Sequence, residues 1–206
     1  IRKSFAEAGW QEDPFSGTRE SVRLNPAFVV CVDSQEIENQ LTSLVRNGHS
    51  LNERGYPVRR LIRLLSLYRG QLLPSLSLDD SCAFDEWLTM KREDLDRLVV
   101  EGAAWLLGYH EQRGDWSAAR SVAEMLTRIS PWDEDFQYHL ILSMLHLKLG
   151  NVARSQYRVV ERYLKEELEV EPGKKLMQLS KEIDRCIHEN KYPAVTPRKE
   201  LALPLH

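Results

Sequence analysis

The sequence predicts a mostly α-helical fold of stacked helical hairpins, with one small β-hairpin near the N-terminus. Two short turn motifs carry this prediction, Gly114-Asp115-Trp116 and Gly150-Asn151-Val152, which begin 36 positions apart. An apolar helical pattern precedes each motif and a more amphipathic one follows it. A helix, a tight turn and a second helix at a period of roughly 34 residues is the spacing of tetratricopeptide (TPR) units. We therefore expect TPR-like stacking, with a plain pair of helical hairpins as the alternative.

The first copy of this repeat carries the clearer turn. We expect Gly114 to end its first helix in a left-handed conformation and Asp115 to begin the second. Ala119 is small enough to let two helices approach closely. In the second copy we expect Ser143 and Ser155 to be the small residues. The repeat is therefore present but degenerate.

Upstream of the repeats, the pattern indicates a helix end, a β-hairpin and then a helix. Residues 1–8 are typical of the last turns of a helix. Residues 18–26 alternate between polar and apolar and predict a short strand, while the β-branched run 28–33 predicts a second strand or its end. Asp33 or Ser34 would cap the next helix. The buried stripe of that helix would consist of Ile37, Leu41, Leu44 and Val45.

The middle of the chain predicts a loop, a short helix, a bend and a long helix. The polar stretch 46–57 indicates the loop, and 58–68 indicates an amphipathic helix with its arginines in solvent. Glycine, proline and small residues indicate a bend over 68–81. A long helical pattern then runs from Phe84 to Arg113, either as one helix or with a break near Gly102. Its first half has a charged face, and its second half should be buried on most sides.

Beyond the repeats, residues 169–175 separate two helices. The terminal helix, 176–187, would cover the open end of the stack, as solenoid folds require. From residue 190 onward, three prolines and scattered charges predict a tail.

The composition is that of an ordinary globular protein and excludes several functional classes. The chain has 206 residues, of which 42% are hydrophobic and 29% charged, with a net charge of -3. Such a balance gives no reason to expect binding to nucleic acid through overall charge, or to an anionic membrane. Three widely spaced cysteines favour reduced thiols, and the absence of a signal peptide or long apolar run favours a cytoplasmic protein. Because the sequence begins at Ile1, we expect it to be part of a longer chain.

No motif supports catalysis, a cofactor or a metal. The Gly-Lys-Lys run at 173–175 lacks the upstream glycine and the hydroxyl residue of a phosphate loop. His139 and His146 lie seven positions apart, but a metal site needs three or four converging ligands. Because His110 and His146 are predicted to be equivalent in the two repeats, a packing role is favoured for both. We predict that the protein is not an enzyme.

Two sets of side chains are candidates for surface or core roles. Basic residues recur every three or four positions on the second helix of repeat two and form either a partner surface or an ordinary solvated face. This basic stripe consists of Arg154, Arg158, Arg162 and Lys165. Four tryptophans are expected in the core or as wedges between helices. They are Trp87, Trp105, Trp116 and Trp132.

Several marks together resemble one family, the bacterial transcriptional activator domain (BTAD) of regulators of the SARP type, the antibiotic regulatory proteins. The marks are the YRGQLLPSL stretch, Asp79-Asp80, Glu86-Trp87, Arg92, Leu95, Gly114-Asp115 and the closing EELEVEP. The resemblance covers about residues 31–188. It implies a helical domain that follows a winged-helix DNA-binding domain of the OmpR type. It also implies three parts of this chain, namely a winged-helix fragment at 1–30, the helical domain at 31–190 and a tail at 191–206.

Within this resemblance, residues 16–26 look like the wing hairpin of the DNA-binding domain, and 30–41 like the junction into the helical domain. The wing residues that the resemblance places near DNA are Thr18, Arg19 and Arg23. We also expect the hairpin to pack against the early helices, covering Val22, Leu24, Phe28 and Val30. At most the last turns of a recognition helix, Ile1 to Phe5, belong to this sequence, so we expect only weak DNA binding without sequence preference.

The resemblance implies partners as well. They are promoter DNA through the intact parent protein, RNA polymerase or other regulator domains, and a second copy in a possible homodimer. A free-standing TPR scaffold that binds peptide tails is the alternative. Such a scaffold would line its groove with Asn, Lys and Arg from the first helix of each repeat, whereas these helices offer mainly Leu, Trp and His.

Overall fold

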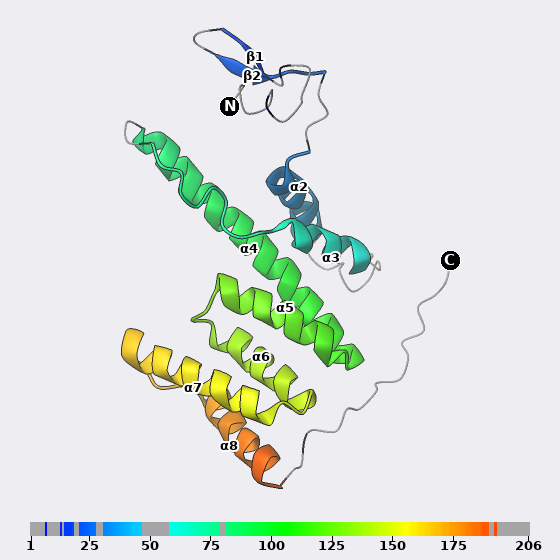
Figure 1. Ribbon diagram of the computed structural model, residues 1–206, viewed down its shortest axis with the longest axis vertical. Coiled ribbons are helices and arrows are strands. Elements are labelled where there is room, and N and C mark those ends of the chain that lie inside the picture. The colour runs from blue at the N-terminus through cyan, green and yellow to red at the C-terminus, as the bar shows by residue number, and fades with distance from the viewer. Residues whose placement is uncertain are drawn as a thin grey trace, which may run out of the picture.

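Helices make up most of the computed structural model, which describes residues 7, 13, 15–18, 21–27, 31–46, 58–78, 81–189 and 192 (Figure 1). The elements are β1 (Phe15–Gly17), β2 (Val22–Leu24), α2 (Asp33–Arg46), α3 (Val58–Leu67), α4 (Cys82–Arg113), α5 (Trp116–Ile129), α6 (Glu134–His146), α7 (Gly150–Glu167) and α8 (Lys174–Glu189). The predicted fold class, mostly α with a small N-terminal β-hairpin, is confirmed.

The two strands form an antiparallel hairpin in which Phe15 lies opposite Leu24 and Gly17 opposite Val22. The hairpin was predicted, but its second strand was placed wrongly. The partner of 22–24 precedes it in the chain, and the Thr18 N–H donates to the carbonyl of Ser21 across the turn. Pro26 lacks an N–H for a sheet ladder and helps to end the strand there.

Downstream, Cys31 and Val32 have no regular structure and Asp33 already begins α2, so the strand predicted over 28–33 is wrong where it can be checked. Residues 28–30 lie outside the described residues. So does the helix end predicted over 1–8, except for Glu7, which is helical.

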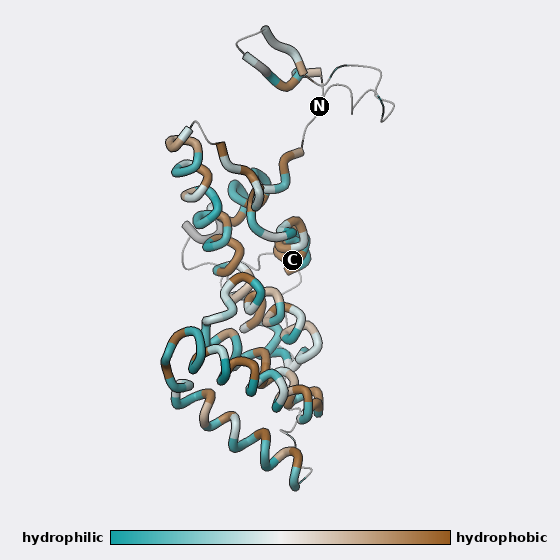
Figure 2. Tube along the Cα trace, turned by 60° about the vertical axis from the view of Figure 1, so that its left-hand side comes forward, coloured by the Kyte–Doolittle hydropathy of each residue, from teal (hydrophilic) through white to brown (hydrophobic). Residues whose placement is uncertain are grey.

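The described residues of the hairpin do not pack against the early helices, so that prediction is wrong. Leu24 is 50% exposed, and every buried core residue of the described chain lies at or beyond Ile37. Figures 1 and 2 both show the hairpin apart from the helices, at the end of the molecule where α2 begins. The side chains of Val22, Phe28 and Val30 lie outside the described residues.

Helices α2 and α3 pack on the middle of α4, which runs without a break through Gly102. Ile37 and Leu41 are buried as predicted, whereas the side chains of Leu44 and Val45 lie outside the described residues. A Cβ at Gly102 would lie 3.3 Å from Cδ1 of Leu61. This glycine therefore lets α3 approach α4 closely without interrupting the helix.

The predicted bend between α3 and α4 is held by two residues of the charged face of α4. The Arg92 guanidinium donates to the carbonyls of Leu72, Leu73 and Leu76. The Tyr68 hydroxyl donates to Asp96 Oδ1 at 2.7 Å. Because of these bonds, Arg92 and Asp96 are not simply solvated, as the charge pattern had suggested.

The structural repeat has a period of 34 residues, which corrects the 36-residue spacing of the glycines. Gly114 is left-handed with φ 72°, and the equivalent left-handed residue is Lys148, with φ 61°. In the first turn the Asp115 N–H donates to the carbonyl of His110, five positions back. In the second turn the Leu149 N–H donates to the carbonyl of Met144, again five positions back. Gly150, the predicted counterpart of Gly114, is instead the first residue of α7.

This register also changes which side chains are equivalent. Ala119 in α5 corresponds to Ala153 in α7, and both are fully buried, while the predicted counterpart Ser155 is exposed. His110 corresponds to Met144, so the predicted equivalence of His110 and His146 is wrong. The cause is that the second turn uses a lysine where the first uses glycine, and glycine spacing therefore misleads.

Helix α8 covers the end of the stack, as predicted, by packing against α6 and α7. Its buried residues are Leu176, Leu179, Ile183 and Cys186. The turn before α8 is held by the first residue of α6, because the Gly173 N–H donates to Glu134 Oε2 at 2.7 Å. The predicted tail beyond residue 192 lies outside the described residues.

Candidate partner-binding surfaces

An apolar ridge lies on the N-terminal half of α4, which extends past α2 and α3 toward the end of the molecule that carries the hairpin (Figure 1). Its residues, Phe84, Trp87 and Met90, are spaced by three and so share one side of the helix. Trp87 is 46% exposed and Met90 59% exposed. The ring of Phe84 lies 5.6 Å from that of Trp87 and is half-buried beside it. We call these three residues the α4 ridge.

The α4 ridge is exposed because the core contacts of this half-helix lie on another side. Leu88 and Leu95 are buried, and Arg92 faces the bend. At the border of the ridge, Lys91 Nζ pairs with Glu38 Oε1 of α2 at 2.7 Å. Tryptophan and methionine are enriched at protein interfaces, because they offer large apolar contact areas. The ridge is thus a surface suited to a protein partner.

Two of the four tryptophan predictions are wrong. Trp105 and Trp116 are half-buried and pack against the core, as expected for wedges between helices. Trp87 and Trp132 are exposed instead, Trp132 by 57%. Hydrophobicity favours burial, but it does not indicate whether any element covers a given face.

The basic stripe on α7 divides into a paired and an unpaired half. Arg154 donates to Asp184 Oδ1 at 2.6 Å, and Lys165 pairs with Glu161 and Glu171. Arg158 and Arg162 are exposed and have no ion pair with any described residue. Within the stripe, Arg158 and Arg162 are thus the two basic side chains without an ion pair to the described part of the chain.

Two of the three predicted wing residues, Thr18 and Arg23, lie on and beside the hairpin. Thr18 follows β1 and its hydroxyl lies 3.3 Å from that of Ser21, so it helps to close the turn. Arg23 lies in β2 and is exposed. Arg19 lies outside the described residues. The hairpin thus presents Arg23 to solvent without grouping it with other described basic side chains.

Three histidines, His110, His139 and His146, occupy packing positions. His146 stacks face to face on Trp116, with ring centroids 3.5 Å apart. Burial lowers the pKa of His146 and of His110 below the ordinary histidine value. His139 Nδ1 lies 2.7 Å from Glu111 Oε1, which joins α6 to α4. In the described part of the chain, no three His, Cys, Asp or Glu side chains gather as a metal site would need.

No described helix combines the length and the apolar character needed to cross a membrane.

Comparison with known protein families gives a match over most of the chain. The family model described as the bacterial transcriptional activator domain matches residues 32–184, which span α2 to α8 and contain both helical repeats. No curated protein and no solved structure matches the chain.

Proposed function

Because this chain belongs to the bacterial transcriptional activator domain family, we propose that it serves a transcription regulator by contacting RNA polymerase through the α4 ridge. Family membership makes it a regulatory domain of the transcriptional-activator type. The proposed contact between the α4 ridge and RNA polymerase rests on one observation, namely that Trp87 and Met90 are both exposed on the protruding half of α4. Large apolar residues of this kind supply most of the binding energy in protein interfaces.

The position of the ridge favours a role between DNA and polymerase. We propose that residues 1–30 are the end of a winged-helix DNA-binding domain, with Thr18, Arg19 and Arg23 in its wing. In that arrangement the hairpin end of the molecule faces the promoter, and the ridge lies at the same end. The helical stack sets the geometry between the two, and the regulator works in the cytoplasm.

The test replaces the ridge in the full-length regulator that contains this chain. Trp87→Ser with Met90→Ser should leave folding and promoter binding intact but reduce transcription activation about tenfold, the effect of a contact worth ~1.4 kcal/mol. Val170→Ser with Met177→Ser removes similarly exposed apolar side chains elsewhere and serves as the matched control. Activation should be measured in vitro with purified polymerase, and promoter binding by gel shift.

The unpaired half of the basic stripe is tested in the same assay. Arg158→Glu with Arg162→Glu is matched by Lys181→Glu with Arg185→Glu, which changes the net charge equally on α8. Full activation by the ridge variant would contradict our proposal. Loss of activation only in the Arg158 and Arg162 variant would move the contact to α7.

A further inference from the structure

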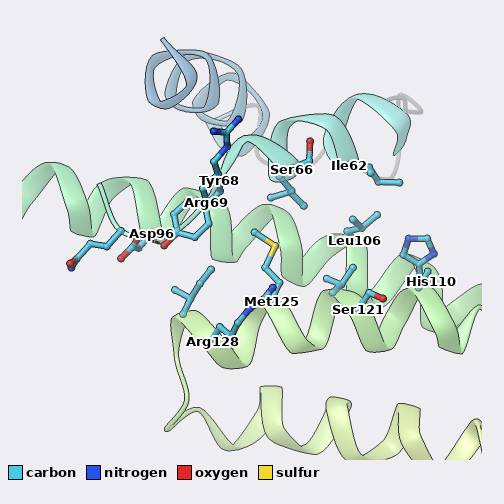
Figure 3. Close-up of a pocket in the computed structure, with 16 residues that line it drawn as sticks. Ile62, Ser66, Tyr68, Arg69, Asp96, Leu106, His110, Ser121, Met125 and Arg128 are labelled. Carbon is cyan, nitrogen blue, oxygen red and sulfur yellow. Dashed lines mark hydrogen bonds between the residues drawn. The ribbon is translucent and has the colours of Figure 1, made fainter. Parts of the chain in front are cut away.

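A groove of about 860 Å³ lies over α4, between α3 and the bend on one side and α5 on the other (Figure 3). It exists because α3 and α5 both pack on α4 and leave space between them. The volume falls within the range of small-molecule sites, roughly 300–1,000 Å³. The α4 ridge and the basic stripe contribute no residues to it.

The walls of the groove are largely apolar. Leu65 and Leu106 are buried at its base, while Val122, Met125 and Ile129 of α5 are half-buried along its side. Along α5 the lining extends from position 118 to 129, which corresponds to ~17 Å of helix. Such a space fits an elongated apolar body better than a compact polar one.

The hydroxyl groups beside these walls are already bonded within their own helices. Ser66 Oγ donates to the carbonyl of Arg63, and Ser121 Oγ donates to that of Ser117. Neither hydroxyl therefore needs a hydrogen-bond partner from a ligand.

One end of the groove is cationic. Arg69 from the bend and Arg128 from α5 line the end that also contains Tyr68 and Asp96 (Figure 3). Neither arginine has an ion pair with any described residue, and both are exposed. The Asp96 carboxylate already accepts the Tyr68 hydroxyl, whose pKa is raised by burial and by this bond. The local charges leave one net positive charge, which suits a single anionic group.

The opposite end is closed by an uncharged side chain. His110 is 9% exposed, and burial lowers its pKa, so its imidazole is neutral at pH 7. The lining thus changes from two arginines at one end to apolar side chains and the His110 imidazole at the other, where Nδ1 of His110 lies 3.4 Å from Asp115 Oδ2.

From this arrangement we propose that the groove binds an amphipathic carboxylic acid, with its carboxylate at the end lined by Arg69 and Arg128 and its apolar chain along α5. Guanidinium groups bind carboxylates through paired, charge-assisted hydrogen bonds, and the apolar walls remove the chain from water. Such a site would make the regulator responsive to a small metabolite of this class. The proposal is independent of where polymerase binds, since it concerns neither the ridge nor the stripe.

Binding of decanoate to the 206-residue chain, measured by isothermal titration calorimetry, tests the proposal. Decan-1-ol, which has the same chain length without the charge, is the matched probe. Arg128→Gln and Arg69→Gln should each weaken decanoate binding about tenfold and leave decanol binding unchanged. Arg162→Gln, an exposed arginine on α7, is the control and should bind decanoate like the wild type.

A second variant fills the groove without touching the arginines. Ser121→Trp places a large ring over the apolar wall and should abolish binding of both probes, while circular dichroism reports whether the helices are retained. Absence of decanoate binding by the wild-type chain would overturn the proposal. So would wild-type decanoate affinity in both glutamine variants, or binding that survives in a folded Ser121→Trp protein.

Discussion

Reciprocal substitutions at the two left-handed turn positions test the 34-residue repeat. Gly114 has φ 72° and Lys148 has φ 61°, and each follows the first helix of its repeat. A left-handed conformation costs an L-residue about 1–2 kcal/mol, whereas glycine loses only about 0.5–1 kcal/mol more than alanine through backbone entropy. We therefore expect Gly114→Ala to lower the free energy of unfolding by about 1 kcal/mol. Lys148→Gly should raise it by about 0.5 kcal/mol.

A second glycine, inside α4, provides the control. Gly108 lies inside α4, and a Cβ built there meets nothing within 4 Å. Gly108→Ala should therefore raise the free energy of unfolding by about 0.5–1 kcal/mol, as expected for a glycine in a helix interior. The three variants are compared by urea denaturation followed by circular dichroism. Their m-values should match that of the wild type, so that shifts in midpoint report stability.

The free energy of unfolding should fall in Gly114→Ala and rise in Lys148→Gly and in Gly108→Ala, so the sign of each change tests the assignment. If Gly114→Ala stabilises the protein as Gly108→Ala does, the first turn is not left-handed. If Lys148→Gly destabilises the protein, position 148 is not the equivalent of 114, and the 34-residue register is wrong.

Two further predictions concern the bend and a buried histidine. Arg92→Met removes three hydrogen bonds to the bend and should lower the free energy of unfolding by about 1–2 kcal/mol, with faster amide exchange over 72–78. His146 has a lowered pKa in the folded state, chiefly through burial, against the opposing influence of Glu182 and Glu111. The unfolded chain therefore binds the proton more readily, and stability is lost as pH falls below the ordinary value of 6.5. His146→Phe keeps a ring on Trp116 and should flatten the change in urea midpoint between pH 7.5 and pH 5. An unchanged pH profile in this variant would assign the dependence to other groups, with His110 the next to test.

The order of the helices could be predicted from sequence because it depends on local patterns. The buried stripe of α2 and the apolar second half of α4 both follow from helical periodicity. The covering role of α8 follows from the same signal, together with the need to close the stack. Such patterns report which side of a helix is apolar, and this was enough for the fold class.

The candidate sites could not be predicted in the same way, because they depend on contacts between distant residues. Arg92 reaches carbonyls about twenty positions earlier, and no spacing rule indicates that pairing. Trp87 is apolar but uncovered, which only the placement of α2 and the bend reveals. The repeat register failed for a related reason, since a lysine adopts the conformation for which glycine is the usual signal.

The single helix α4 connects the proposed partner surface with the proposed ligand groove. Trp87 and Leu106 lie 19 residues apart on it, or ~28 Å along its axis. A continuous helix with one hydrogen-bonded arrangement offers no second state by itself, and coupling between sites needs an element with two. The bend is the better candidate, because Tyr68 and Arg69 line the groove while Arg92 fixes the bend to α4 next to the ridge. Under the proposed function, a ligand at Arg69 would influence a polymerase bound at the ridge only if it changed the arrangement of the bend.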